Sequence, residues 1–230
     1  VSARERGVVV SNIPGKTAPV VAEHAFSLMM AASRRVAFQT AELKAGRWTR
    51  VENISLAGKT VGVVGTGAIG QQMIRLCQAI GMRVLAWTFH PSAQRADELG
   101  VTFVDREELF AQSDVVSLHV KLTEQTEKMV GRAELALMKP GTLLVNTARG
   151  GVIDRDALVD ALQSGHLGGA GLDVFATEPL PPDDPLLACD QVVLTPHNAD
   201  QTPEGVELLN VGAVDNVLAF LRGDPQNVVT

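Results

Sequence analysis

A glycine-rich run, Gly65-Thr66-Gly67-Ala68-Ile69-Gly70, follows directly on the apolar stretch 60–64. This order is typical of a strand, a tight turn and a helix start. Glycine at the first position permits the turn, at the second lets backbone N–H groups approach an anion, and at the third lets helix and strand pack closely. The expected helix, residues 68–80, directs its positive end to the same place. The run predicts a cradle for a dinucleotide pyrophosphate, made by Gly65, Gly67, Ala68, Ile69 and Gly70, and the alternative is a purely structural turn.

Composition restricts the class of protein further. The 230 residues are 46% hydrophobic with a formal net charge of -6, so we expect a globular chain whose main partner is not nucleic acid. No apolar run approaches the roughly 18 to 20 residues of a membrane span, and the N-terminus lacks a signal-peptide pattern, so we expect a cytoplasmic protein. The two cysteines, Cys77 and Cys189, match no metal or redox spacing. We expect both thiols to be reduced and no metal to be bound.

From residue 60 onward, short β-rich runs alternate with helical patterns, which favours an α/β fold with a doubly wound parallel sheet of the Rossmann type. The clearest helix is 154–164, where Asp154 caps the first turn and Gly165 ends the helix. Seven strands are expected, at residues 60–64, 83–87, 101–103, 114–118, 142–146, 169–173 and 192–195.

Two segments lie outside this alternation. Residues 8–11 have the composition of a strand, and apolar residues at helical spacing predict one long helix over residues 20–36. A second long helix is expected over residues 203–222. We expect these two helices to pack on each other or on a missing partner.

Four further strings belong to one ordered pattern: Asn-Thr-Ala-Arg-Gly at 146–150, Gly-Leu-Asp-Val-Phe at 171–175, Glu178-Pro179, and Thr-Pro-His at 195–197. With Val-Ala-Glu-His at 21–24 and Asp-Val-Val-Ser-Leu-His at 114–119, the chain resembles the D-isomer-specific 2-hydroxyacid dehydrogenase family, in its phosphoglycerate dehydrogenase-like branch. The resemblance covers nearly the whole chain. It implies an oxidoreductase that transfers hydride between a nicotinamide cofactor and a D-2-hydroxy acid/2-keto acid pair.

The resemblance implies that Arg149, Glu178 and His197 form the catalytic set. The planar, permanently charged fork of Arg149 suits the carboxylate and carbonyl of a 2-keto acid. His197 is expected to act as general acid and base at the carbonyl oxygen, and Glu178 to orient the ring and stabilise its cationic form, raising its pKa. Taken singly, each residue has an ordinary structural alternative, and the ordered set carries the interpretation.

The remaining cofactor contacts are also implied by the resemblance. The residues concerned are Thr88, His119, Thr147, Ala148, Asp173 and His197. Asp173 is expected to face the nicotinamide amide, and its alternative is a turn residue at a strand end. Lys121 stands where the family usually has proline, so the loop after His119 departs from the family pattern.

The identity of the cofactor is open between NAD and NADP, and we favour NAD. An NAD fingerprint has an acidic residue at the end of the second strand, where this chain has Thr88. Losing that carboxylate removes the repulsion that excludes a 2′-phosphate, yet the first arginine beyond it is Arg95. Thr88 is able to bond either ribose, and a protonated His90 would favour phosphate.

The family resemblance also implies a domain organisation. We expect residues 1–18 to be the remnant of a smaller substrate domain, 19–202 the dinucleotide-binding domain, and 203–230 a helix that returns to the substrate domain. Most of that substrate domain is absent from the sequence, so we expect the isolated chain to bind cofactor and to turn over poorly. The acid that is the substrate is left open.

A homodimer is implied as well, with helix 20–36 and the arm 46–48 near the interface. The alternative for the arm is that Trp48 covers the chain's own core. The rival function is a cofactor-sensing protein like the transcriptional corepressors of this fold. A second rival is a relative that acts on formate, phosphite or a phosphorylated hydroxy acid.

Overall fold

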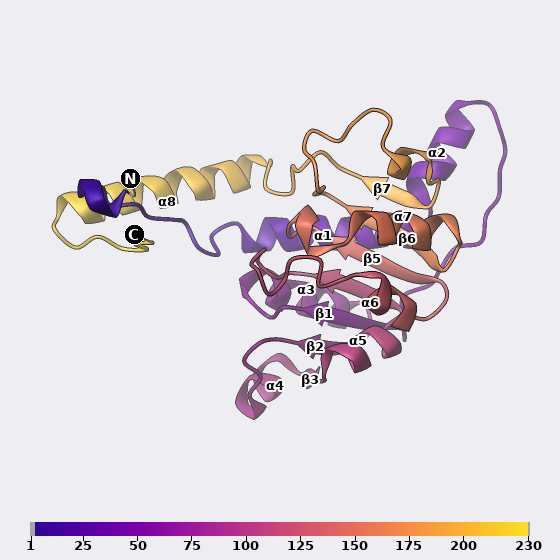
Figure 1. Ribbon diagram of the computed structural model, residues 1–230, viewed down its shortest axis with the longest axis horizontal. Helices are drawn as coiled ribbons and strands as arrows, with labels where there is room; N and C mark the ends of the chain where they lie inside the picture. Colours follow the sequence, from indigo (N-terminus) through magenta and orange to yellow (C-terminus); the bar gives the residue numbers. More distant parts are fainter. Residues whose placement is uncertain (1–2, 230) are drawn as a thin grey trace.

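The computed structural model describes residues 3–229 and contains a seven-stranded parallel sheet in the order β3-β2-β1-β4-β5-β6-β7 (Figure 1). Every predicted strand from residue 60 onward is present, with ends that differ by at most two residues. The strands are β1 (Thr60–Val64), β2 (Arg83–Trp87), β3 (Thr102–Phe103), β4 (Val115–Leu118), β5 (Thr142–Asn146), β6 (Leu167–Leu172) and β7 (Val192–Leu194). β1, β4 and β5 are buried along their whole length, which explains their continuous apolar composition.

Helices cover both faces of the sheet, as a doubly wound fold requires. On one face, α1 (Ala18–Ser33) and α3 (Ala68–Ala79) pack on inward residues such as Val63 and Val145. The other face is covered by α5 (Arg106–Gln112), α6 (Arg132–Leu137) and α7 (Arg155–Gln163). Asp154 caps α7 as predicted, because its carboxylate accepts the N–H of Ala157 at 3.2 Å.

The winding direction reverses between β1 and β4, the two central strands. From β1 the chain runs outward through β2 to β3. It then returns to the other side of β1 to form β4 and runs outward to β7. The carboxyl ends of these strands form one edge of the sheet, named here the carboxyl edge. Ligands of open α/β sheets bind at this edge beside the reversal point, and the glycine-rich run follows β1 there.

Two predictions for the N-terminal third are wrong. Residues 8–11 form no strand within residues 3–229: Ser11 makes an isolated antiparallel bridge with Val228, and the Val10 carbonyl accepts the N–H of Val229 at 2.9 Å. The single helix expected over residues 20–36 is broken after α1, where Arg35 adopts a φ of 50° and α2 (Val36–Lys44) starts in a new direction. Apolar spacing predicted α1 correctly, but Val36 is 49% exposed and does not continue the buried stripe.

The C-terminal helix α8 (Pro203–Leu221) extends away from the sheet, with the N-terminal segment beside its far end (Figure 1). It therefore packs with that segment, while α1 packs on the sheet beside α3. The remaining elements are α4 (Ala93–Leu99) and the 3-10 helices η1 (Arg4–Arg6), η2 (Gly150–Val152) and η3 (Pro185–Ala188). None of the helices within residues 3–229 is long and apolar enough to cross a membrane.

Candidate active site

The glycine-rich loop has the geometry that its sequence predicts. Gly65 has a φ of 95°, and a Cβ there would lie 2.6 Å from the carbonyl oxygen of His119. A Cβ on Gly70 would lie 2.0 Å from the carbonyl oxygen of Gly65, so helix and turn approach as closely as the pattern requires. Gly67 is different, because a Cβ there meets no protein atom within 4 Å. The open space above Gly67 is where an anion would approach the first turn of α3, which contains Ala68 and Ile69.

Three buried polar atoms beside this loop have no partner within the described residues. They are the hydroxyls of Thr66 and Thr147 and the Nδ1 atom of His119. The residues follow β1, β5 and β4, three adjacent strands of the carboxyl edge. Buried polar groups are normally paired, so a bound polar molecule at this edge would satisfy them. With the open space at Gly67, these atoms fit a dinucleotide.

His119 is held neutral at this edge. Its Nε2 atom lies 2.9 Å from the Ser117 hydroxyl, and burial lowers the pKa of the ring to about 4. A neutral ring offers hydrogen bonds without placing a cation beside the glycine-rich loop.

Glu178 and His197 meet directly, although 19 residues separate them. His197 Nδ1 donates to the Oε2 atom of Glu178 at 2.7 Å, and the other oxygen of Glu178 accepts the N–H of Phe175 at 2.9 Å. Burial alone would raise the pKa of Glu178, but the hydrogen bonds from His197 and Phe175, with the charges of His197 and Arg149, outweigh it and lower the pKa. Because a carboxylate only accepts, Nδ1 carries the proton and Nε2 is the atom left for a reactant.

Arg149 lies on the loop after β5, next to Thr147 and Ala148. Its side chain is exposed, and Nη1 donates to the carbonyl of Ala148 at 2.6 Å. The following residue, Gly150, touches the loop that carries Glu178, because a Cβ at Gly150 would lie 1.9 Å from the carbonyl carbon of Phe175. This close approach brings the charge of Arg149 near Glu178.

Asp173, at the end of β6, is fully buried, accepts three hydrogen bonds and lies close to His24. Its carboxylate accepts the Thr195 hydroxyl at 2.6 Å and the N–H groups of Asn198 and Ala199 at 3.0 and 3.1 Å, and His24 Nε2 lies 3.4 Å away. These contacts fix the loop 195–199, in which His197 has a φ of 52°. The predicted contact of Asp173 with the nicotinamide amide stays a prediction.

The sequence predicts no contact at this edge for three of its residues. Asn146 is buried, accepts the Ala148 N–H at 2.9 Å and donates to the Arg149 carbonyl at 3.0 Å, so it shapes the loop with Arg149. His24 of α1 donates from Nε2 to the Thr195 hydroxyl at 2.9 Å. Asn146 and the third residue, Thr66, stand inside strings that the sequence singles out, whereas no spacing rule links His24 to a residue 171 positions away.

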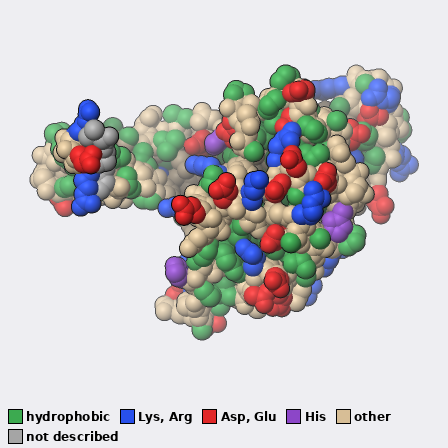
Figure 2. All heavy atoms as spheres, viewed as in Figure 1, with side chains coloured by type: hydrophobic (Ala, Val, Ile, Leu, Met, Phe, Trp, Pro, Cys, Tyr) green, Lys and Arg blue, Asp and Glu red, His purple; other side chains and the backbone are tan. Residues whose placement is uncertain are grey.

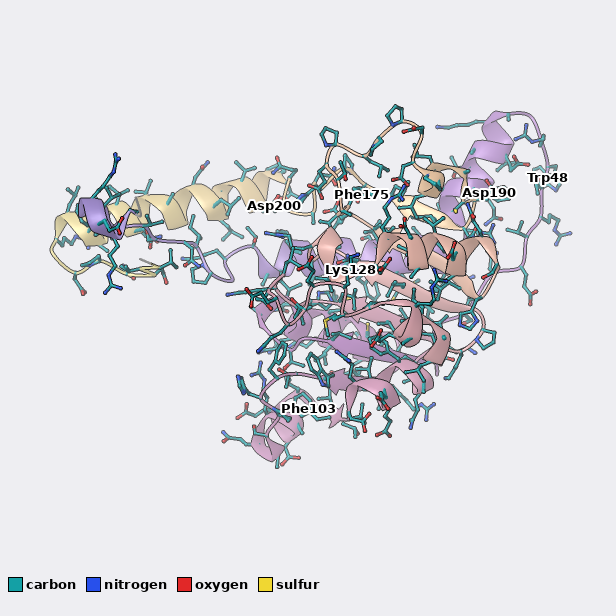
Figure 3. All side chains as sticks on the ribbon, in the orientation of Figure 1. Trp48, Phe103, Lys128, Phe175, Asp190 and Asp200 are labelled. Atoms are coloured by element: carbon teal, nitrogen blue, oxygen red, sulfur yellow. The ribbon has the colours of Figure 1, made fainter. Side chains whose placement is uncertain are left out.

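An apolar groove of about 580 Å³ borders the Glu178 and His197 pair. Its lining residues are Phe175, Glu178, Pro179, Leu180, Leu187, Leu194, Thr195, Pro196 and His197. Phe175 lies on the long loop above β6 and β7 (Figure 3). The groove sets an apolar wall beside a proton donor.

The model of the D-isomer specific 2-hydroxyacid dehydrogenase NAD-binding domain matches residues 26–199. The chain belongs to the D-isomer-specific 2-hydroxyacid dehydrogenase family. Residues 26–199 are its NAD-binding domain, which confirms the predicted cofactor class, and the family consists of oxidoreductases.

Named relatives agree with this membership. A glyoxylate reductase of Korarchaeum cryptofilum is 43% identical over 99% of this chain, which spans 70% of that relative. A D-3-phosphoglycerate dehydrogenase of Archaeoglobus fulgidus is 41% identical over 97% of this chain, which spans only 43% of that enzyme. Among solved structures, a D-lactate dehydrogenase of Aquifex aeolicus complexed with NAD and lactic acid superposes with a TM-score of 0.87 at 33% identity, over 99% of this chain and 74% of that one.

Proposed function

We propose that this chain carries the cofactor domain and the proton-transfer residues of an enzyme that interconverts a 2-keto acid and a D-2-hydroxy acid. The observation that carries the proposal is the 2.7 Å hydrogen bond between Glu178 and His197 at the edge where the glycine-rich loop lies. His197 is the general acid and base, Glu178 its orienting carboxylate, and Arg149 the cation for the substrate carboxylate. Bound nicotinamide supplies or accepts the hydride at C2 of the acid.

The proton steps follow from which atoms are engaged. In reduction, Nε2 of protonated His197 gives its proton to the carbonyl oxygen, and in oxidation Nε2 takes the proton of the hydroxyl group. Glu178 remains a carboxylate throughout, because its pKa is lowered. Its negative charge stabilises the cationic ring and holds Nδ1 so that Nε2 faces the reactant.

For the cofactor, the residues available are the open turn at Gly67, the hydroxyls of Thr66 and Thr147, Ala148, and His119. Thr88 is proposed to lie at the adenosine ribose and Asp173 near the nicotinamide. The unpartnered buried atoms of Thr66, Thr147 and His119 support this assignment. We propose that these residues, with Arg149, Glu178 and His197, form a cofactor cleft along the carboxyl edge.

The test is oxidation of NADH and NADPH by the full-length protein over a panel of 2-keto acids, including glyoxylate, hydroxypyruvate and phosphohydroxypyruvate. His197→Ala is expected to lower kcat by about 100- to 10,000-fold, the usual contribution of a general acid. His166→Gln is the matched control, since His166 bonds the Leu135 carbonyl at the opposite end of β6. Tight cofactor binding without turnover of any acid would contradict the proposal and favour a sensor.

We also propose a homodimer formed by α2 and the arm 46–48. Leu43 and Trp48 are 56% and 84% exposed, and Figure 3 shows Trp48 at the outer end of the molecule, so Trp48 does not cover the chain's own core. Large exposed apolar side chains near each other in the sequence favour a partner surface. Light scattering on the double variant Leu43→Ser, Trp48→Ser is expected to give a monomer, whereas Leu137→Ser, a 43% exposed residue of α6, leaves a dimer. A wild-type monomer at micromolar concentration contradicts this proposal.

The domain boundaries and the compartment are proposals of the same kind. Exposed apolar residues of α8, including Val214 and Val217, support the assignment of residues 203–230 to a substrate domain together with residues 1–18. The free thiols of Cys77 and Cys189 support a reducing compartment such as the cytoplasm.

A further inference from the structure

Thr88 lies where dinucleotide-binding folds recognise the ribose 2′ position. β2 pairs with β1 so that Trp87 is opposite Val64, and the N–H of Gly65 donates to the Trp87 carbonyl at 2.8 Å. Thr88 is the next residue, so it stands beside the glycine turn. NAD-specific sites have a carboxylate at this place, which bonds the 2′-hydroxyl and repels a 2′-phosphate. Thr88 is uncharged and therefore repels neither ribose.

Arg95 brings a positive charge to the same turn. It belongs to α4, and its Nη2 atom donates to the carbonyl oxygen of Thr66, inside the glycine-rich loop. This is the one hydrogen bond of the Arg95 side chain among the described residues, so four of its five N–H donors are free for a ligand. Its cation is therefore anchored at the turn that Thr88 adjoins.

No carboxylate within residues 3–229 forms an ion pair with Arg95. Asp97 and Glu98 lie on the same helix, and the Glu98 carboxylate accepts the Gln94 side-chain amide at 2.8 Å instead. Thr66 itself is 1% exposed, and its hydroxyl has no partner. The turn thus presents an unneutralised guanidinium, a buried unpaired hydroxyl and no negative charge at the strand end.

We infer that Thr88 and Arg95 make this site accept a ribose 2′-phosphate, so that the domain binds NADPH more tightly than NADH. The inference rests on the proposed cofactor cleft and adds a specificity to it. An arginine fork pairs with a phosphate through charge-assisted hydrogen bonds, which are about twice as strong as neutral ones. The absence of a carboxylate at residue 88 leaves that pairing unopposed.

The test measures binding of half-cofactors that differ only in the 2′-phosphate. Titration calorimetry with 2′,5′-ADP and with 5′-AMP reports the adenosine end alone and requires no turnover. The 2′-phosphate is expected to tighten binding about tenfold, as one charge-assisted interaction would. Thr88→Asp is expected to weaken 2′,5′-ADP about tenfold and to leave 5′-AMP unchanged or tighter. Nicotinamide fluorescence on titration with NADPH and NADH checks the same order for the complete cofactors.

Two further variants separate recognition of phosphate from support of the loop. Arg95→Gln is expected to abolish the advantage of 2′,5′-ADP while changing 5′-AMP affinity by less than about twofold, and Arg95→Lys to retain part of the advantage. Arg83→Gln is the matched control, because Arg83 is an exposed arginine at the amino end of β2, the strand that Thr88 follows. It removes one positive charge from the protein and should change neither affinity.

Each outcome decides between the readings. Equal or tighter binding of 5′-AMP by the wild-type protein overturns the inference and leaves the cofactor cleft intact. An Arg95→Gln variant that loses both nucleotides equally shows that Arg95 only supports the loop, which overturns the inference as well. Failure of the folded wild-type protein to bind any of the nucleotides overturns both the inference and the proposed cleft.

Discussion

His119 sets a pH dependence of stability at the scale of a single residue. Its pKa is about 4 in the folded chain, against 6.5 for an unperturbed ring, because burial disfavours the cation. Between these values the unfolded chain binds the extra proton, so the free energy of unfolding rises with pH. The full contribution is present above pH 6.5 and is lost as pH falls toward 4. The slope from this residue is at most about 1.4 kcal/mol per pH unit.

Urea unfolding at pH 4.5, 5.5 and 7 measures this slope. His119→Asn is expected to flatten it, since asparagine has no proton to gain. His166→Gln serves as the comparison, because its ring bonds a backbone carbonyl near the surface. Equal slopes for wild type and His119→Asn would show that the ring titrates alike in the folded and unfolded chain.

We expect Asp173 to act on catalysis by positioning the loop of His197 rather than by contact with the reacting atoms. Asp173→Asn keeps the size of the side chain but replaces one acceptor oxygen with an N–H donor, which faces the N–H of Ala199 or Asn198. The loop that holds His197 at positive φ is then released. We expect kcat to fall about 10- to 100-fold, as a displacement near 1 Å produces, while the dissociation constant of 5′-AMP is unchanged. Asp190→Asn, on an exposed loop, is the control, and an unchanged kcat for Asp173→Asn contradicts this role.

How far the sequence predicts such residues depends on where their partners lie. Glu178 and His197 stand in recognisable strings, and the structure pairs them as the family resemblance implies. His24 was assigned to an interface from its helix alone, but its partner is the hydroxyl of Thr195. A hydrogen bond between α1 and the end of β7 depends on how the helix packs across the sheet, which no local pattern contains.

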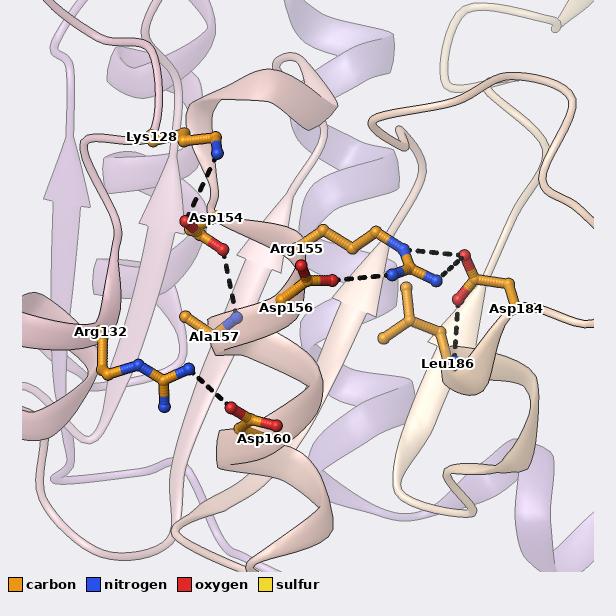
Figure 4. A network of polar contacts seen from close by, with 9 residues as sticks. All are labelled: Lys128, Arg132, Asp154, Arg155, Asp156, Ala157, Asp160, Asp184 and Leu186. Atoms are coloured by element: carbon orange, nitrogen blue, oxygen red, sulfur yellow. Dashed lines mark hydrogen bonds and ion pairs between the residues drawn. The ribbon is translucent and has the colours of Figure 1, made fainter.

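Among the elements, the connection between α7 and residues 176–184, the loop before η3, is open to a quantitative test. Arg155 donates from Nε and Nη2 to one oxygen of Asp184 at 3.1 and 2.9 Å, and the other oxygen accepts the Leu186 N–H (Figure 4). The Asp184 side chain is 3% exposed, whereas that of Arg155 is 38% exposed. This half-buried fork fastens the loop that carries Glu178 to the body of the domain.

Asp184→Asn is expected to lower the free energy of unfolding by about 1–3 kcal/mol, because it weakens two charge-assisted hydrogen bonds to a buried group. Figure 4 contains a natural control, the pair of Arg132 and Asp160, whose side chains are 72% and 57% exposed. Asp160→Asn should cost at most about 1 kcal/mol, as solvent-exposed pairs do. Urea unfolding of both variants gives the comparison. Equal losses of unfolding free energy would show that the pair of Arg155 and Asp184 stabilises the fold no more than a solvent-exposed pair.

Element prediction succeeded where burial forces a pattern and failed where it does not. β1, β4 and β5 are covered on both faces, so each needs a continuous apolar run, and such a run predicts a buried strand. Val8, Val9 and Val10 have the same composition but are 39–53% exposed, and the N–H of Val229 that the Val10 carbonyl accepts at 2.9 Å belongs to no strand within residues 3–229. The break at Arg35 likewise has no proline or glycine to announce it, since a non-glycine residue adopts the left-handed conformation there.

At the scale of the whole molecule, the sheet and its helices form a body with intermixed positive and negative side chains on the face in Figure 2. Helix α8 projects from this body and is named here the α8 extension. The α8 extension is joined to the N-terminal segment by polar contacts centred on Asn216, which is 7% exposed. Its side-chain amide donates to the Asn12 carbonyl at 2.8 Å and accepts from the Asn227 side chain at 2.9 Å. These three segments therefore order one another.

Asn216→Ala tests whether the α8 extension unfolds separately from the sheet. Loss of two half-buried hydrogen bonds costs about 1–2 kcal/mol, which raises the opening of the α8 extension roughly 5- to 30-fold. Amide hydrogen exchange in the C-terminal half of α8 and near Asn12 is expected to accelerate by that factor, while the amides of β1 and β4 exchange as before. Asn210→Ala, an exposed position on the same helix, should change neither. Equal acceleration in the central strands would show instead that the α8 extension and the sheet unfold as one cooperative unit, because a single global opening would then expose both.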